Sequence, residues 1–278
     1  MEKVHFVSNY LLNPTNPVTV NLIGAGGTGS VMITVLGRIN NALLALDHPG
    51  LDVRLFDGDT ISKNNTKRQL FSESEVGLPK STCLINRVNR FWGTGWKAFA
   101  YHYTTENKYL MRNCKSANIT ISCVDKVQAR FEIAEILRKI KLTENHPDRC
   151  IYWLDLGNSR YTGQSLIGTV HPVRQPTSKL YEPTERLPFV TEEYRNLLLQ
   201  TEETDKSPSC SAAEALAEQD LFINPAIATM AGRLLMNMFT EGVINVRGFF
   251  MNIEDYQMQP ITVNSIPLEF LNPLSVAA

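Results

Sequence analysis

The sequence feature that most constrains the fold is one continuous unit between residues 18 and 59. A short apolar run, Val18–Ile23, leads into the turn Gly24-Ala-Gly-Gly-Thr-Gly29, and a long amphipathic segment follows. A second apolar run, Leu51–Phe56, ends at Asp57. Strand, glycine turn, helix and strand in this order are typical of a nucleotide-binding unit. The unit therefore predicts a nucleotide site where the first strand turns into the helix.

The residues of this unit have separate expected roles. Glycines let the backbone turn tightly and approach a phosphate, and a helix that starts near Thr28 offers unpaired N–H groups and the positive end of its dipole. Asp57, at the tip of the second strand, is placed to accept hydrogen bonds from ribose hydroxyls. The residues that we expect to bind the nucleotide here are Gly24, Gly26, Gly27, Gly29 and Asp57.

Apolar runs and amphipathic segments alternate through the first half of the chain. Apolar residues recur at helical spacing from Met32 to Leu46 and from Lys126 to Lys141, and strand-like runs lie at 97–103, 117–123 and 150–156. A further strand, Leu166–Val170, is a candidate for an antiparallel partner. Alternating strands and helices predict a mostly parallel sheet. We expect an α/β, Rossmann-like fold whose mostly parallel, mixed sheet is flanked by helices.

We expect residues 1–278 to form a single domain with three main parts. Residues 18–156 are the nucleotide-binding half. Residues 171–209 are a long crossover excursion over the surface, with one modest helical stretch at 191–199. Residues 210–263 supply C-terminal helices and a hairpin of two strands. Residues 1–17 contain two Asn-Pro pairs, which favour an edge segment or short strand followed by a turn, with little room for a helix.

Charge and cysteine content limit the function classes. The formal net charge of −1 and the pI near 6.5 provide no basic surface for nucleic acid or for a membrane, so we expect neither partner. Five cysteines without close pairing indicate neither a disulfide framework nor a zinc site. The start of the chain lacks a signal-peptide pattern, and no apolar run has membrane-spanning length. We expect a cytoplasmic protein.

Three charged residues downstream decide between a dinucleotide and a triphosphate. A hydride-transfer dehydrogenase would use the glycines and Asp57 but leaves Gln69 and the charged residues Arg68, Lys80 and Asp125 without a role. Cleavage of ATP at the α-phosphate develops negative charge on pyrophosphate, which fixed cations stabilise, and a carboxylate at a strand end can hold magnesium. Taken singly, the cations are also compatible with solvated loop charges, and Asp125 with the cap of a following helix.

The same residues carry a family resemblance. The glycine turn, then Asp57-Gly-Asp59 with Asn65 and Arg68-Gln69, then Gly77-Leu-Pro79-Lys80, then Val124-Asp125 with Arg130, resembles the adenylation domain shared by ThiF, MoeB and the ubiquitin-activating enzymes. The resemblance covers roughly residues 18–263. Within it, Pro208-Ser-Cys210-Ser and the run from Gln219 to Asn224 are most similar to the ThiF-family proteins of plasmid-borne PRTRC cassettes.

This resemblance implies a reaction and a set of residue roles. Asn65, Arg68, Gln69 and Lys80 would hold the triphosphate of ATP, and Asp125 would serve magnesium, with Arg68, Lys80, Asp125 and Cys210 as the catalytic set. Family members join a carboxylate to AMP with loss of pyrophosphate. The carboxylate is usually the C-terminal glycine of a small ubiquitin-like, β-grasp protein. Family members are commonly dimers, so a homodimer is implied as well.

Cys210 is a candidate acyl acceptor. It directly precedes Ser211, which opens a capping-box pattern, so its sulfur would lie at a helix N-terminus where the dipole favours the thiolate. The segment is similar in pattern and place to the Pro-x-Cys-Thr segment that supplies the thioester cysteine of ubiquitin-activating enzymes. The alternative is a small buried hydrophobic side chain.

The chain also departs from the family pattern. It has no paired Cys-x-x-Cys zinc ligands, so we predict no structural zinc. Residues 1–17 contain no arginine, whereas ThiF and MoeB carry an N-terminal arginine that reaches the partner subunit's ATP site. Lys126 stands where an asparagine commonly follows the magnesium aspartate. Two other readings therefore stay open: adenylation of a small molecule or RNA base, and a nucleotide-binding interaction module without turnover.

Overall fold

We examined a computed structural model, which describes residues 1–141, 143, 146–204 and 220–264, with the side chains of 111–113 and 201–204 left aside. The elements in chain order are β1 (Glu2–Phe6), α1 (Asn9–Leu12), β2 (Val18–Ile23), α2 (Gly27–Ala45), β3 (Leu51–Phe56), the 3-10 turns η1 (Asn65–Lys67) and η2 (Glu73–Glu75), α3 (Lys80–Trp92), β4 (Lys97–Phe99), α4 (Lys108–Asn113), β5 (Ile119–Ser122), α5 (Val127–Lys139), β6 (Tyr152–Asn158), β7 (Thr162–Thr169), β8 (Tyr181–Pro183), α6 (Val190–Glu193), α7 (Arg195–Thr204), α9 (Ile223–Glu241), β9 (Val243–Ile244), β10 (Val246–Asn252) and β11 (Gln257–Thr262).

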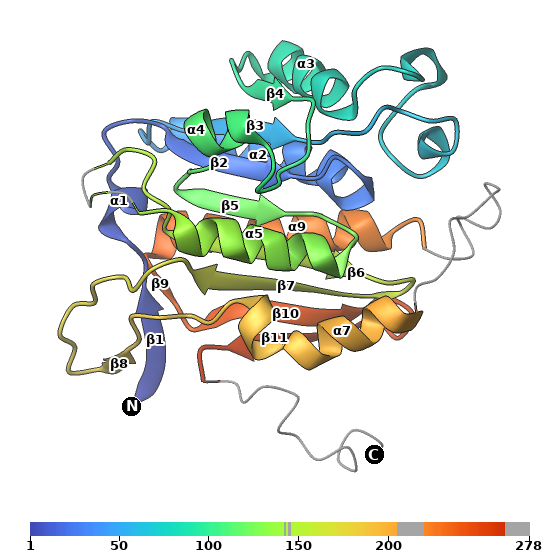
Figure 1. The fold of residues 1–278 in the computed structure, drawn as a ribbon. Coiled ribbons are helices and arrows are strands. Elements are labelled where there is room, and N and C mark those ends of the chain that lie inside the picture. Colours follow the sequence, from blue (N-terminus) through green and yellow to red (C-terminus); the bar gives the residue numbers. More distant parts are fainter. Residues whose placement is uncertain (142, 144–145, 205–219, 265–278) are drawn as a thin grey trace.

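An eight-stranded sheet forms the centre of the molecule, in the order β11-β10-β7-β6-β5-β2-β3-β4 (Figure 1). The strands from β6 to β4 are parallel, whereas β7, β10 and β11 pair antiparallel. The expected α/β fold with a mixed, mostly parallel sheet is confirmed. β10 and β11 form the expected hairpin, and the strand at 166–170 is antiparallel and longer than expected.

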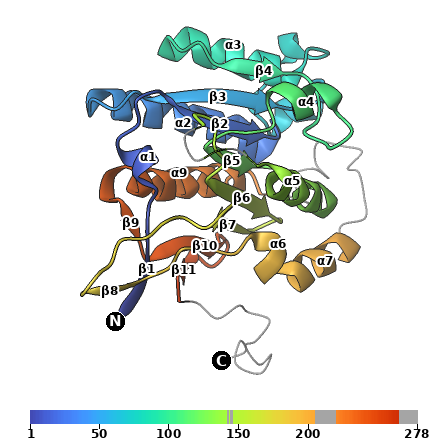
Figure 2. The same cartoon turned by 60° about the vertical axis from the view of Figure 1, so that its left-hand side comes forward.

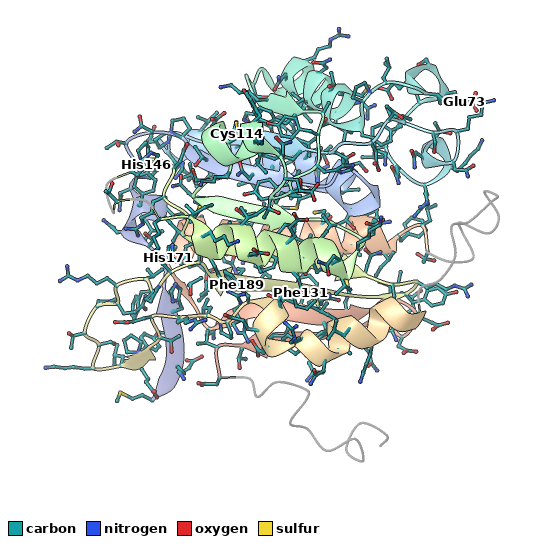
Figure 3. All side chains as sticks on the ribbon, viewed as in Figure 1. Glu73, Cys114, Phe131, His146, His171 and Phe189 are labelled. Atoms are coloured by element: carbon teal, nitrogen blue, oxygen red, sulfur yellow. The ribbon has the colours of Figure 1, made fainter. Side chains whose placement is uncertain are left out.

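Helices cover both faces of this sheet (Figure 2). One face packs against α2, α3 and α9 in a large apolar cluster that includes Leu22, Met32 and Ile227. The other face packs against α4, α5, α6 and α7 in a second cluster. Phe131 and Phe189 mark this second layer (Figure 3). β2 is covered on both faces, so all six of its residues are buried, and its two polar side chains, Thr19 and Asn21, are hydrogen-bonded to Asn118 and to the Cys114 carbonyl.

The order of the parallel strands determines where a ligand can bind. From β2 the chain goes on to β3 and β4 on one side, and then crosses to β5 and β6 on the other side. In open α/β sheets of this order, ligands bind outside the carboxyl ends of the strands, where the direction of winding changes. That point lies between β2 and β5.

Three local expectations differ from the structure. Residues 1–17 do form a strand, but β1 lies in a separate three-stranded sheet between β8 and β9, and a one-turn helix, α1, follows it. The strand expected at 97–103 ends at Phe99. The helix expected at 191–199 is two helices that meet at Tyr194, whose buried ring packs edge-on against Phe250 at a centroid distance of 5.4 Å.

No helix within the described ranges is both long enough and apolar enough to cross a membrane.

Candidate nucleotide-binding site

The glycine loop connects β2 to α2 at the winding switch point. Gly24 has a φ of +95°, which L side chains rarely adopt, and a Cβ there would lie 2.6 Å from the Cys123 carbonyl oxygen at the end of β5. A Cβ on Gly29 would overlap the Gly24 carbonyl oxygen. These two glycines are required by close backbone approach between neighbouring strands and the helix. The loop is therefore held tightly against the sheet.

Gly26 and Gly27 have different surroundings. Nothing lies within 4 Å of a Cβ built on Gly26, so this side of the loop faces open space. A Cβ on Gly27 would instead meet the side-chain amide of Asn224, with the nearest atom at 2.6 Å. The α2 helix begins at Gly27 with no side-chain cap, so the N–H groups of its first turn have no partner from a capping residue. An exposed backbone beside uncapped N–H groups suits an anionic ligand.

Asp57 fastens the glycine loop to the end of β3. Its two carboxylate oxygens accept hydrogen bonds from the Ala25 N–H at 2.6 Å and from the Asp59 N–H at 2.8 Å. Burial raises the pKa of Asp57 above its ordinary value, even though these N–H groups and Lys80 favour the ionised form. The ribose role stays a prediction; each carboxylate oxygen has capacity for one more hydrogen bond.

Lys80 and Asp59 form an ion pair at the start of α3. The Lys80 ammonium lies 2.9 Å from Asp59 Oδ2, with the lysine side chain 8% exposed and the aspartate side chain 57% exposed. Burial raises the pKa of Asp59, but the Lys80 hydrogen bond and charge outweigh it, so the pKa lies below its ordinary value. Lys126 adds positive charge near the same carboxylate, and His102 Nε2 lies 3.9 Å from Asp59 Oδ1. Basic side chains from three segments of the chain therefore gather near one exposed acid.

Asp125 follows β5, directly beside the glycine loop. Its side chain is exposed and makes no hydrogen bond with any residue that the structure describes. It does not cap α5, whose N-cap is Lys126. Within the described ranges no group of three or more His, Cys, Asp or Glu side chains could hold a metal. An exposed, unengaged carboxylate still fits magnesium, which keeps several waters and binds phosphate oxygens alongside one or two carboxylates.

The remaining predicted residues lie in the loop after β3. Asn65 Oδ1 accepts hydrogen bonds from the N–H and the hydroxyl of Ser62 at 2.8 and 3.0 Å, which stabilises η1. Arg68 is half-buried and ends η1. Gln69 has a buried Oε1 without a partner among the described residues. The roles of these three residues toward a triphosphate stay predictions, and Cys210 lies outside the described residues.

A buried polar pair behind the loop was only partly anticipated. Arg130 Nε contacts both oxygens of Asp155 at 3.1 Å, and a second guanidinium nitrogen donates to the Leu156 carbonyl at 3.2 Å. Arg130 also approaches the Asp125 carbonyl at 3.5 Å. Arg130 is part of the sequence pattern, whereas nothing local in the sequence marks Asp155. Only the sheet register places Asp155 of β6 opposite Ser122 of β5, close to Arg130.

The model of the ThiF family matches residues 8–272, which is nearly the whole chain. The chain belongs to the ThiF family. A search of curated protein sequences finds no match.

Solved structures share the fold of this ThiF-family protein. PaaA is similar with a TM-score of 0.58 and 15% identity, over 88% of this chain and 73% of that one. E. coli MccB solved with MccA has a TM-score of 0.55 and 14% identity, over 93% and 66%. E. coli MccB solved with ATP has a TM-score of 0.53 and 16% identity, over the same shares. The chain thus spans just under two thirds of the length of MccB.

A cavity of about 520 Å³ lies at the opposite, amino-terminal edge of the parallel strands, lined by residues such as Thr19, Asn40 and Trp96. Arg54 in this cavity is already held, by Asp148 at 3.1 Å and by the Ser116 carbonyl at 3.0 Å. This cavity lies away from the glycine loop.

Proposed function

We propose that this ThiF-family protein binds ATP at its glycine loop and joins a carboxylate to AMP with release of pyrophosphate. The observation that carries the proposal is the junction of α2 and β2. There, open space beside Gly26 and an uncapped helix N-terminus face the same edge of the sheet as Lys80 and Asp125. The ATP complex of the structural neighbour MccB supports the choice of nucleotide.

The proposed reaction is a single displacement. A carboxylate oxygen of the substrate attacks the α-phosphorus, a new phosphorus–oxygen bond forms, and the bond to pyrophosphate breaks. The chain contributes positioning and charge rather than a covalent group. Backbone N–H groups of the loop and the cations Arg68 and Lys80 would hold the phosphates. Magnesium beside Asp125 would neutralise charge on the phosphate oxygens when it is bound.

The proposed substrate is the C-terminal glycine of a ubiquitin-like, β-grasp protein. The MccB neighbour was solved with MccA, a second named component, which supports a macromolecular carboxylate as substrate. We further propose that the Cys210 thiolate attacks the acyl carbon of the adenylate, so that a thioester forms and AMP leaves. If so, a Cys210→Ala protein still exchanges pyrophosphate but forms no reductant-sensitive adduct with the β-grasp protein. Formation of the same adduct by this variant would exclude Cys210.

The proposal includes a homodimer. Apolar side chains at the C-terminal ends of α2 and α3 are exposed, with Leu44 at 52%, Leu46 at 61% and Phe91 at 77%. Leu44 of α2 and Gly93, directly after α3, line the same cavity, so the two helix ends are adjacent. Analytical ultracentrifugation of the wild type and of a Phe91→Asp variant tests this. The variant should sediment as a smaller species than the wild type.

ATP–pyrophosphate exchange tests the reaction itself. The protein is mixed with ATP, magnesium, labelled pyrophosphate and a candidate β-grasp protein, and label should appear in ATP only when the carboxylate partner is present. A β-grasp protein that lacks its terminal glycine is the matched control. Tight ATP binding without exchange, for any partner offered, would instead favour a nucleotide-binding module without turnover.

A further inference from the structure

A buried asparagine from the C-terminal half of the chain contacts the glycine loop. Asn224 is 4% exposed and lies at the start of α9. The hydroxyl of Thr28 donates to Asn224 Oδ1 at 2.7 Å, across 196 residues of sequence. The same amide lies against Gly27, where any Cβ would be 2.6 to 2.9 Å from its atoms. Asn224 therefore touches the first two residues of α2, at the loop proposed to hold phosphates.

The packing of α2 and α9 shows that the two helices run parallel. Asn224 contacts Gly27 at one end, and Gly232 packs against Val35 further along. From the first contact to the second, α2 advances from residue 27 to 35 and α9 from residue 224 to 232. Both helices therefore run in the same direction. Their amino-terminal ends meet at the glycine loop. Parallel neighbours place two positive dipole ends side by side, an arrangement that a bound anion stabilises.

Asparagine suits this position for a specific reason. A carbonyl oxygen is needed to accept the Thr28 hydroxyl, and the flat amide fits against the bare backbone of Gly27. A carboxylate could also accept the hydroxyl, but it would place negative charge next to the loop. An apolar residue would fill the core as well, yet it would leave the Thr28 hydroxyl without this partner.

We propose that Asn224 is a positioning residue for nucleotide binding, which holds the first turn of α2 so that its N–H groups face the phosphates. The inference rests on the proposed function, because it assigns a role toward ATP. It adds a determinant from α9 to a site otherwise built from β2, β3, α3 and β5. The C-terminal half of the chain thus contributes directly to the geometry of the glycine loop.

The decisive variant is Asn224→Asp, measured by equilibrium binding of a fluorescent ATP analogue with magnesium and by thermal unfolding. Asp keeps the acceptor for Thr28, and a carboxylate at a helix N-terminus favours the helix, which offsets part of the cost of burying the charge, so the variant should still fold. The added negative charge beside the loop should weaken ATP binding by about tenfold or more. Weaker binding would place Asn224 beside the phosphates, and the Thr28 variants test whether its hydrogen bond to Thr28 positions the first turn of α2.

Two matched controls complete the experiment. Asn16→Asp places the same charge on the exposed surface at the opposite edge of the sheet and should leave ATP affinity unaltered. Thr28→Ser keeps the hydroxyl and should bind ATP like the wild type, whereas Thr28→Val should bind more weakly. If the wild type binds ATP and Asn224→Asp binds it equally well, the positioning role is wrong while the proposed function stands. A wild type that does not bind ATP overturns both.

Discussion

Two ion pairs near the glycine loop show how burial separates structural from ligand-directed charge. Arg130 and Asp155 are 5% and 1% exposed, and both carboxylate oxygens are engaged. Lys80 is nearly as buried at 8%, but its partner Asp59 is 57% exposed. The first pair has no face open to solvent. The second presents a carboxylate at the surface, where an incoming phosphate could compete with it for Lys80.

The difference has an energetic basis. Removing one member of a fully buried pair leaves an uncompensated charge, which typically costs several kcal/mol. A pair with one exposed member is screened by water and contributes about 0–1 kcal/mol. The buried pair joins α5 to β6, and Arg130 also approaches the Asp125 carbonyl. The half-exposed pair leaves its lysine available to a ligand.

The largest expected effect comes from breaking the buried pair. Arg130→Met leaves Asp155 buried without its guanidinium partner, so the free energy of unfolding should fall by about 3–5 kcal/mol in urea titrations. Arg138→Met is the control, because it makes the same change in the same helix. Arg138 contacts Glu192 at 2.9 Å, and its side chain is 49% exposed. Its replacement should lower the free energy of unfolding by less than about 1 kcal/mol. Equal losses in the two variants would contradict the distinction.

The half-exposed pair should respond in activity rather than in stability. Lys80→Met keeps the aliphatic stem but removes the charge, and ATP–pyrophosphate exchange should fall by about 10²–10³-fold. The free energy of unfolding should change by less than about 1 kcal/mol. Lys67→Met removes an exposed lysine that lies 3.9 Å from Glu73, and it should leave exchange intact. Exchange at the wild-type rate in Lys80→Met would remove this lysine from the site.

How far the sequence predicts the molecule depends on the range of the contacts involved. β2 and β3 have the expected bounds, because each is a continuous apolar run between turn residues. The pairing of β1 with β8 was not predicted, since residues 2–4 meet 181–183 and no local pattern encodes that partner. The residues that approach the loop from elsewhere, Asn224 and Asp155, were missed as site components for the same reason.

Candidate site residues follow the same division. The positions of Gly24, Asp57 and Lys80 at strand ends and a helix start could be read from local order, and the structure brings them together. Their partners could not be read in this way. The engagement of Asp57 by Ala25 and of Lys80 by Asp59 depends on how β3 and α3 pack beside the loop. A side-chain partner is a property of the tertiary fold.

Two glycines of the loop allow effects on stability and on ligand binding to be separated, because alanine adds a single methyl group at each position. Gly24→Ala forces a side chain into a left-handed conformation, 2.6 Å from a backbone oxygen, and should cost about 1–3 kcal/mol of stability. Gly26→Ala, at a φ of −76°, has open space around it and should fold normally. The methyl group of Gly26→Ala would project where the phosphates approach, so ATP affinity should fall by about tenfold. Unchanged affinity in a folded Gly26→Ala protein would place the phosphates elsewhere.

The smallest effect on stability is expected from a buried network of neutral groups around His5. This network is a third case beside the two ion pairs. His5 is fully buried, with Nδ1 2.7 Å from the Thr184 carbonyl and Nε2 2.9 Å from the Tyr152 hydroxyl. The Ser8 N–H donates to the same hydroxyl at 2.9 Å. This pattern is complete when Nδ1 carries the proton and Nε2 accepts from tyrosine. A second ring proton would require the tyrosine O–H to find another acceptor.

Burial accordingly lowers the pKa of His5 below its ordinary value of 6.5, despite the opposing Thr184 hydrogen bond. The unfolded chain then binds more protons than the folded one below about pH 6.5, so stability is fully present above that pH and is lost as pH falls toward the folded pKa. Urea titrations at about pH 7 and about pH 5 should show this loss in the wild type and a smaller one in His5→Gln. A loss of the same size in His5→Gln would mean that other groups control the acid sensitivity. It would also mean that packing, rather than this network, joins the three-stranded sheet β8-β1-β9 to β6.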